Sequence, residues 1–222
     1  MKHDIEAIKN EFEELLEALA PTDIRSFLQH CGDYDSFRRW RNRMRDVDTL
    51  TEYGCALACG CSRAVLIPVA GDYVFKFQYD DGDCINYCEQ ETKVYRAAVE
   101  RGAEKFFAWT ECIGRYGETL IYAMEKVDAS MDRCSDDSYQ YHAERWREEN
   151  PDADPDECEL DGYDDTDGML DYALACNGSA MEKAIALISD LDINDLHAGN
   201  WGYRGTTLVL IDYGGYGLKL DL

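Results

Sequence analysis

The spacing of apolar side chains divides this 222-residue chain into helical and strand segments. Over residues 3–20 an apolar side chain returns every three or four positions, which predicts an amphipathic helix that ends before Pro21. A second helix is expected to run through Leu28, because Thr22 and Asp23 can cap its start. The chain therefore begins with a helical segment.

A change to period-two alternation after this segment predicts a small sheet. Residues 52–80 alternate apolar and polar side chains around two short turns, which is typical of three consecutive strands. Residues 86–101 return to helical spacing and are expected to pack on the sheet. Two further strands are expected over residues 105–112 and 119–127.

The second half of the chain opens with an acidic stretch, residues 128–172, in which we expect a solvated loop. A short helix is expected to precede the most acidic part, around Tyr139 to Trp146. A longer helix is predicted from about Gly168 to Leu187, and Asn177-Gly178 can interrupt it. Its expected core positions are Leu170, Leu174, Met181, Ile185 and Leu187.

Charge restricts the partners that this chain can bind. It carries 46 acidic and 22 basic side chains, a net charge of −24, which argues against binding nucleic acid or anionic membrane through a broad basic surface. The excess of acidic side chains is compatible with three explanations: an acidic surface that aids solubility, binding to a partner with a basic surface, or mimicry of nucleic acid. Without an apolar run of ~20 residues or a signal peptide, we expect a cytoplasmic protein and no disulfide scaffold.

A cluster of arginines in the first fifty residues has two possible interpretations. A third helix is expected from Ser36 to Met44, near five arginines: Arg38, Arg39, Arg41, Arg43 and Arg45. These can form an intramolecular salt-bridged face or a docking site for phosphate or an acidic partner.

Three cysteines are spaced C-x3-C-x-C: Cys55, Cys59 and Cys61. Without a second pair or a nearby His, buried thiols fit them better than zinc does.

An acidic run in the second half resembles the start of a Ca²⁺ loop, with Asp152, Asp154 and Asp156 at alternate positions. The sixth position of the run holds Glu157 rather than Gly, and the twelfth holds Tyr163 rather than Glu. A solvated loop is therefore the better interpretation.

The end of the chain combines three residues that suit phosphoryl transfer. Asp195 is followed five positions later by Asn200, and Asp212 comes after a short apolar strand. In phosphoryl transfer one carboxylate orients or deprotonates the attacking hydroxyl, while an amide oxygen and a second carboxylate hold Mg²⁺ on the nucleotide phosphates. Mg²⁺ keeps several waters, so one Asn and one Asp suffice once phosphate oxygens complete the shell.

A lone lysine lies within the third expected strand. Lys76 on a buried strand face is costly unless its charge meets a partner. Glu91 on the following helix is the expected partner, and Glu89 is also available. Upstream, the small-residue turn Gly60-Cys61-Ser62 separates two strands.

This order of features resembles the protein-kinase-like superfamily. Residues 195–200, Asp-Leu-His-Ala-Gly-Asn, look most like the aminoglycoside and choline phosphotransferase branch. Gly60 to Arg63, with the late Asn200-Trp-Gly-Tyr203 and residues 211–216, is similar to small kinase-like proteins of bacteriophages. The resemblance covers about residues 52–127 and 185–217.

The resemblance implies an α+β, bilobal fold that binds ATP and Mg²⁺ between its lobes. The expected parts are an N-terminal helical extension over 1–50, a small antiparallel-sheet lobe over 51–127 and a reduced helical lobe over 128–222, with an acidic insert at about 148–168. Only ten residues follow Asp212, so we do not expect here the helices with which members of the superfamily bind their acceptors.

The resemblance also implies a role for each site residue. Asp195 is the expected catalytic carboxylate, Asn200 and Asp212 the expected Mg²⁺ ligands, and Lys76 the expected phosphate contact held by Glu91. Backbone amides of Gly60, Cys61 and Ser62 would approach the phosphates, although Cys59 and Cys61 stand where relatives often have Gly. The backbone from Ala123 to Val127, with Glu125 and Val127 as expected contacts, would face the adenine ring. His197 is expected to brace the loop.

Two functions therefore follow as hypotheses. The first is an ATP·Mg²⁺-dependent phosphotransferase that moves the γ-phosphoryl group to a hydroxyl on a protein or a small molecule, in the host cytoplasm if the chain is phage-encoded. The second is a non-catalytic kinase-fold inhibitor or adaptor whose acidic surface binds a basic partner protein. The complete Lys76, Asp195, Asn200 and Asp212 set favours the first, whereas the short tail and the charge of −24 favour the second.

Overall fold

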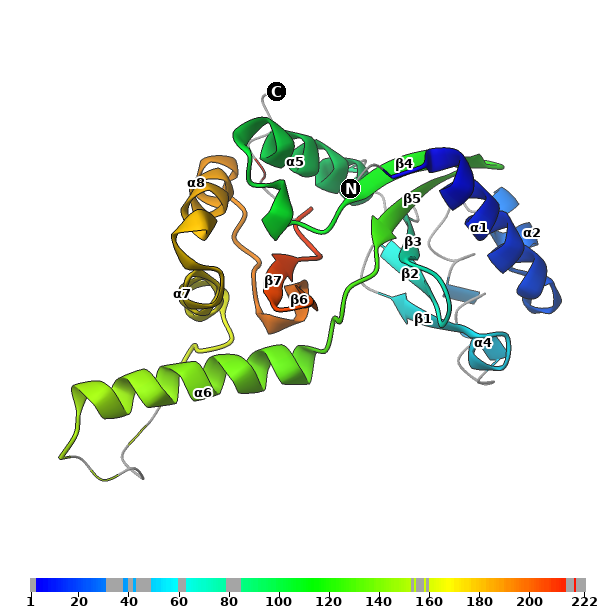
Figure 1. Cartoon of the computed structure of the whole chain (residues 1–222). Coiled ribbons are helices and arrows are strands. Elements are labelled where there is room, and N and C mark those ends of the chain that lie inside the picture. The colour runs from blue at the N-terminus through cyan, green and yellow to red at the C-terminus, as the bar shows by residue number, and fades with distance from the viewer. Residues whose placement is uncertain are drawn as a thin grey trace. The chain divides into compact units, whose positions relative to one another are not determined.

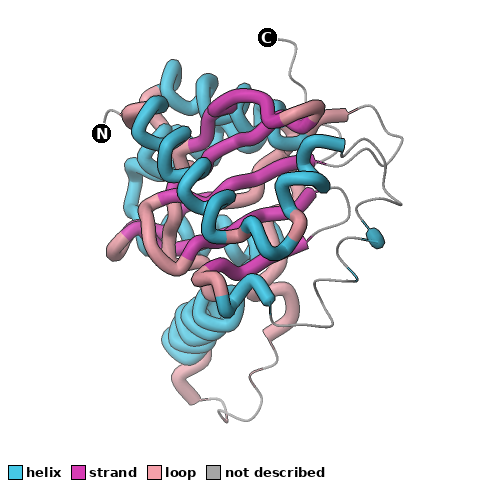
Figure 2. The backbone as a smooth tube through the Cα atoms, turned by 90° about the vertical axis from the view of Figure 1, so that its right-hand side faces the viewer, coloured by secondary structure: helices cyan, strands magenta, loops and turns pink. Residues whose placement is uncertain are grey.

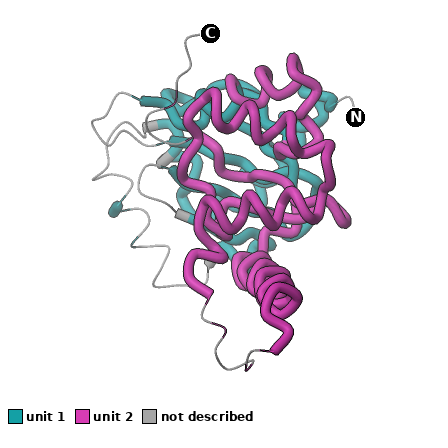
Figure 3. Tube along the Cα trace, turned by 90° about the vertical axis from the view of Figure 1, so that its left-hand side faces the viewer, with its two compact units in different colours: residues 1–92, 109–126 teal, residues 93–108, 127–222 magenta. Residues whose placement is uncertain are grey.

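The computed structural model describes residues 3–30, 38, 39, 42, 49–59, 63–78, 85–152, 154, 158, 160–214 and 218. The fold is α+β, with a five-stranded antiparallel sheet, a two-stranded hairpin and several helices (Figure 1). The chain divides into two compact units (Figure 3). Unit 1 contains residues 1–92 and 109–126, and unit 2 contains residues 93–108 and 127–222.

The sheet of unit 1 confirms the predicted strands in number and order. Its strands are β1 (Cys55–Cys59), β2 (Arg63–Pro68), β3 (Tyr73–Gln78), β4 (Thr110–Tyr116) and β5 (Thr119–Glu125). They lie side by side in the order β1-β2-β3-β5-β4, with every pair antiparallel (Figure 2). β3 is therefore a central strand.

Helices cover both faces of β3. On one face the Phe12 ring of α1 (Ile5–Ala18) lies 4.9 Å from the Phe75 ring, centroid to centroid. On the other face Glu91, from the first turns of α5 (Tyr87–Arg101), contacts Lys76. Consecutive residues of β3 are consequently buried, because each face of the strand meets a helix.

The N-terminal helices agree with the predicted periodicity. The Asp4 side chain caps α1 by accepting hydrogen bonds from the backbone of Glu6 and Ala7. A 3₁₀ turn and two more helices follow: η1 (Ala20–Thr22), α2 (Ile24–His30) and α4 (Thr49–Glu52). Thr22 donates its hydroxyl to the Leu19 carbonyl, so it closes α1 rather than capping α2 as expected. The predicted third helix and its arginines lie mostly outside the described residues.

Unit 2 contains the following elements: η2 (Glu104–Phe106), α6 (Met131–Glu149), α7 (Thr166–Asn177), η4 (Gly178–Met181), α8 (Glu182–Leu191), η5 (Ala198–Asn200), β6 (Trp201–Arg204) and β7 (Thr207–Leu210). The predicted long helix is interrupted at Gly178, whose φ is +68°. The interruption therefore falls where Asn177-Gly178 indicated.

The buried face of α7 differs from the prediction. Of the predicted core positions, Met181 and Leu187 are buried, whereas Leu170, Leu174 and Ile185 are only half-buried. The buried residues of α7 are Met169, Tyr172 and Ala173. Asn177 binds the backbone of Leu208 through both ends of its amide, at 2.8 and 3.2 Å, and the Tyr172 hydroxyl lies 2.8 Å from that of Tyr203. These polar contacts with the β6–β7 hairpin set the rotation of α7.

The strand predicted over residues 105–112 was wrong in its bounds, since β4 spans 110–116. The residues just before it belong to unit 2 instead. Phe107 forms an isolated parallel bridge with Leu210, and the Ala108 N–H donates to the Leu210 carbonyl at 2.7 Å. The apolar run is thus buried against β7 and adds nothing to the start of β4.

The short helix expected around Tyr139 to Trp146 is confirmed, but it is longer than predicted: α6 is a helix of 19 residues that begins at Met131, where a loop was expected. Its buried residues are Cys134, Ser138 and Ala143, small side chains that give only a weak apolar period. Arg133–Asp137 and Arg145–Glu149 add pairs four residues apart. No helix among the described residues combines the length and apolar character that crossing a bilayer requires.

Gly168 allows the first turn of α7 to pack against the preceding turn. A Cβ at this position would lie 2.6 Å from the carbonyl oxygen of Tyr163, which also accepts a hydrogen bond from Ser138 of α6. We expect Gly168→Ala to lower the free energy of unfolding by about 1–3 kcal/mol, because backbone must move to admit the methyl group. Urea unfolding would measure the change.

The control is Gln140→Ala on the exposed side of α6, which should stay within about 0.5 kcal/mol of the wild type. Equal stability of the Gly168→Ala variant and this control would contradict the close approach.

Candidate functional site

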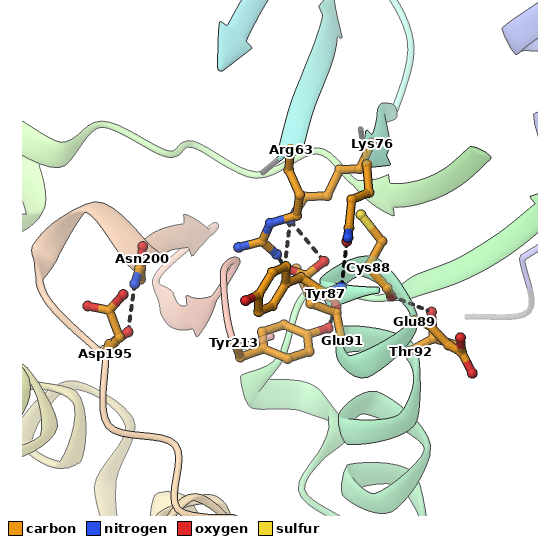
Figure 4. Close-up of polar contacts among 12 residues, drawn as sticks. Arg63, Lys76, Tyr87, Cys88, Glu89, Glu91, Thr92, Asp195, Asn200 and Tyr213 are labelled. Carbon is orange, nitrogen blue, oxygen red and sulfur yellow. Dashed lines mark hydrogen bonds and ion pairs between the residues drawn. The ribbon is translucent and has the colours of Figure 1, made fainter. Parts of the chain in front are cut away.

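Lys76, Arg63 and Glu91 meet in unit 1. Figure 4 shows Arg63 from β2 and Lys76 from β3 directed toward Glu91 on α5. The Lys76 Nζ lies 3.0 Å from Glu91 Oε1 and 3.1 Å from Oε2. An Arg63 guanidinium nitrogen donates to the same Oε1 at 2.7 Å. The predicted pairing of Lys76 with Glu91 is therefore confirmed, with a second cation added.

Strand register and helix period explain why these side chains converge. Val65 pairs with Lys76 and Arg63 pairs with Gln78, so Arg63 and Lys76 share one face of the sheet as diagonal neighbours. α5 presents Glu91 to that face. Glu89, the alternative partner, is exposed and sits in the first turn of the helix.

Burial makes this cluster an electrostatic unit. The Glu91 side chain is fully buried, while the side chains of Lys76 and Arg63 are 7% and 17% exposed. A carboxylate out of contact with water needs cations and hydrogen bonds around it. The Arg63 guanidinium also lies 5.6 Å from the centre of the Tyr87 ring. Tyr87 precedes Glu91 by one helical turn, so α5 supplies both of these groups to Arg63.

Arg63 was not assigned a role from the sequence. A signal was available, because strand alternation places residue 63 on the face of residue 65, which pairs with Lys76. Using that signal requires the register of β2 on β3. The sequence of the turn between the two strands does not determine this register.

The remaining expected nucleotide contacts of unit 1 are not all supported. Gly60, Cys61 and Ser62 lie outside the described residues. The Glu125 N–H donates to the Trp109 carbonyl at 2.8 Å, and its carboxylate accepts from the Trp109 N–H at 2.9 Å. Glu125 thus holds the start of β4 through its N–H and its carboxylate. The expected contacts of Glu125, and of Val127 in unit 2, with an adenine ring stay predictions.

Asp195 and Asn200 form the centre of a second cluster, in unit 2 (Figure 4). The Asn200 side-chain amide donates to the Asp195 backbone carbonyl at 2.6 Å. This bond uses the amide nitrogen and fixes the side chain, so the amide oxygen is the atom that Asn200 can offer to a metal ion. Asn200 itself is buried, whereas the Asp195 side chain is 72% exposed.

The β6–β7 hairpin brings Asp212 to Asn200. Asn200 directly precedes β6 and Ile211 directly follows β7, so both lie at the open end of the hairpin. The Ile211 N–H donates to the Asn200 carbonyl at 2.9 Å. Tyr213, the next residue after Asp212, is buried and donates its hydroxyl to the Ala108 carbonyl at 2.6 Å. Asp212 is therefore held between two anchored neighbours.

Thr166 holds the Asp195 loop on both sides of the carboxylate. Its hydroxyl donates to the Asn194 carbonyl at 2.7 Å and accepts from the Leu196 N–H at 3.2 Å. Further along the loop, the Ala198 N–H donates to the Asp164 carbonyl and the Trp201 indole donates to the Leu196 carbonyl. The result is an ordered backbone that presents one exposed carboxylate. No pattern in the sequence linked Thr166 to this loop.

His197 lies beside Asp195 and contributes to the same loop. Its Nδ1 accepts a hydrogen bond from the Gly199 N–H at 3.1 Å, which agrees with the expected bracing role. Its Nε2 lies 3.8 Å from Asp195 Oδ1. The ring thus limits how far the Asp195 side chain can turn.

The donors of unit 2 suit a hard cation better than a soft one. Asn200 and Asp212 offer amide and carboxylate oxygens, the ligand types that Mg²⁺ takes. Burial raises the pKa of Cys134 to about 11, so its thiol stays protonated near neutral pH and is a poor metal ligand. Among the described residues no group of three or more His, Cys, Asp and Glu could hold a metal ion by itself.

No protein-family model matches this chain, and no curated protein or solved structure is significantly similar to it.

We expect Glu91→Gln to destabilise unit 1 strongly. The change leaves Lys76 and Arg63 facing each other without their shared carboxylate, and breaking a buried ion pair costs about 3–5 kcal/mol. Thermal or urea unfolding would measure the loss. Glu89→Gln, two residues earlier on an exposed position, is the matched control and should cost less than about 0.5 kcal/mol. Equal effects of the two changes would contradict the central role of Glu91.

Thr166→Val should loosen the Asp195 loop. Valine has the shape of threonine but can neither donate to Asn194 nor accept from Leu196, at a cost of about 1–2 kcal/mol. Hydrogen exchange of the Leu196 amide should become faster by about tenfold, because its acceptor is gone. Thr207→Val on β7 serves as the control, and unchanged exchange at Leu196 in Thr166→Val would argue against this support.

Proposed function

We propose that this chain is a kinase-like phosphotransferase that uses ATP and Mg²⁺ and has a bilobal arrangement of its two units. The observation that carries the proposal is the Asn200 side chain bound to the Asp195 backbone, with Asp212 at the same end of the hairpin. Phosphoryl transfer needs a carboxylate for the hydroxyl together with an amide oxygen and a second carboxylate for the metal. One ordered loop and one hairpin supply all three.

Asp195 would act on the acceptor. Its exposed carboxylate can accept the proton of a substrate hydroxyl, whose oxygen then bonds to the γ-phosphorus as the bond to the β–γ bridging oxygen breaks and ADP leaves. The loop bonds of Thr166 and Asn200 hold this carboxylate in position before the substrate arrives. Positioning of this kind lowers the entropy that the reaction must lose at the transition state.

Asn200 and Asp212 would hold the metal ion. Bound Mg²⁺ would neutralise charge on the phosphate oxygens. Asn200 is fixed through its amide nitrogen, and the backbone at Asp212 is held by the anchored Ile211 and Tyr213. Lys76 of unit 1, oriented by Glu91, would contact the phosphates of the same nucleotide.

A second function is supported by a separate observation, the net charge of −24. A non-catalytic adaptor or inhibitor of the same fold would bind the basic surface of another protein by charge complementarity. The two functions differ in whether Asp195 and Asp212 are needed, and the experiment below separates them.

The phosphotransferase proposal predicts a Mg²⁺-dependent effect of ATP on stability. At ~100 times its dissociation constant, MgATP should add about 2.7 kcal/mol to the free energy of unfolding of the wild type. Asp212→Ala should abolish the gain because it removes a metal ligand. Asp195→Asn should keep the gain but slow the release of ADP from ATP by about 10²- to 10⁴-fold. Differential scanning fluorimetry and a coupled ADP assay would measure both.

Asp136→Ala on the exposed side of α6 is the control for loss of one carboxylate. ADP release at the wild-type rate from Asp195→Asn would refute the assigned role of Asp195. A wild type that MgATP does not stabilise would favour the adaptor, and capture of a basic partner by the Asp195→Asn, Asp212→Ala double variant would then support it.

A further inference from the structure

We propose that Arg63 is a second phosphate-binding residue, so that unit 1 holds a polyphosphate between two cations oriented by one carboxylate. This inference rests on the proposed function, since it concerns the phosphate end of the same nucleotide. It concerns residues of unit 1 alone: Arg63, Lys76, Tyr87 and Glu91.

The two cations lie close to each other. Arg63 donates to Glu91 Oε1 at 2.7 Å and Lys76 Nζ lies 3.0 Å from the same oxygen. Like charges at such separations repel, and Glu91 offsets that repulsion. A polyphosphate presents several anionic oxygens along a short chain, so two adjacent cations match it better than one does. The pair is therefore suited to a ligand with more than one phosphate.

Arg63 is placed where a ligand can reach it. It is the first residue of β2, so it lies at the end of its strand. Its side chain is 17% exposed, more than twice the exposed fraction of Lys76, at 7%. Lys76 is thus the deeper of the two cations, and Arg63 the more accessible.

Arg63 is also oriented in advance. The carboxylate of Glu91 holds one guanidinium nitrogen, and the Tyr87 ring lies 5.6 Å from the guanidinium carbon. A guanidinium is planar and offers five N–H groups in a fixed fork, more than its bond to Glu91 uses, and this geometry suits paired contacts with phosphate oxygens. An ammonium group in its place would keep the charge but lose the paired geometry. A lysine substitution consequently separates charge from geometry.

The test measures binding of two probes to the full chain by isothermal titration calorimetry: MgATP and inorganic tripolyphosphate. Arg63→Gln should weaken both by about tenfold or more, because charge-assisted hydrogen bonds are lost. Arg63→Lys should keep the fold and weaken both several-fold. Adenosine, which has no phosphate, should bind each variant as it binds the wild type. Arg115→Gln, an exposed arginine of β4 in the same unit, should leave all three affinities unchanged.

Loss of charge beside Glu91 can prevent Arg63→Gln from folding. In that case the affinity of Arg63→Lys for tripolyphosphate tests the inference. Tripolyphosphate binding to Arg63→Lys at the wild-type affinity would overturn the inference, and so would a fall in stability of Arg63→Gln without any change in affinity. Normal phosphoryl transfer by Arg63→Gln would overturn this inference and leave the proposed function intact. Arg63-dependent binding of tripolyphosphate, together with no phosphoryl transfer by the wild type, would support this inference and refute the proposed function.

Discussion

Unit 1 depends on a carboxylate that has no contact with water. Glu91 is fully buried, and Lys76 and Arg63 both bind its carboxylate and so offset the cost of burying the charge. The three side chains come from β3, β2 and α5, so their contact fixes the position of the first turns of α5 on the sheet. Phe75, on the opposite face of β3, meets α1 and needs no such charge balance. One face of the strand is thus held by packing and the other by electrostatics.

The carboxylate of Asp195 in unit 2 is exposed, in contrast with the buried carboxylate of Glu91. The Asp195 side chain is largely exposed and stays hydrated, while the order of the loop comes from backbone groups bound by Thr166, Asn200 and Trp201. A hydrated carboxylate on a fixed backbone costs little stability and remains free to accept a proton. A buried carboxylate between cations cannot do so, but it orients those cations. The two clusters therefore suit different tasks, a proton acceptor in one unit and an anion contact in the other.

The sequence predicted those features whose signal is local. Alternation located the strands of the sheet, the apolar period located α1, and the cost of burying Lys76 pointed to Glu91. The errors arose where distant contacts decide. Only the middle of α6, around Tyr139 to Trp146, was predicted, because Cys134, Ser138 and Ala143 bury a face with little apolar volume. The rotation of α7 follows from bonds that Asn177 and Tyr172 make with the hairpin. In the site, Asp195, Asn200 and Asp212 could be chosen by type and order, whereas Thr166 and Arg63 required the fold.

The net charge of −24 opposes the approach of the phosphate ligand proposed above, but this opposition weakens with distance. Exposed charges farther than about 8–10 Å are largely screened at physiological ionic strength, so most of the acidic surface affects the rate of encounter more than the bound state. Contacts near 3 Å between a phosphate and partly buried cations are screened much less. An acidic chain that binds a polyanion therefore needs its cations gathered and held at one place. Lys76 and Arg63 on Glu91 meet that requirement, because the carboxylate that holds them together is itself shielded from water.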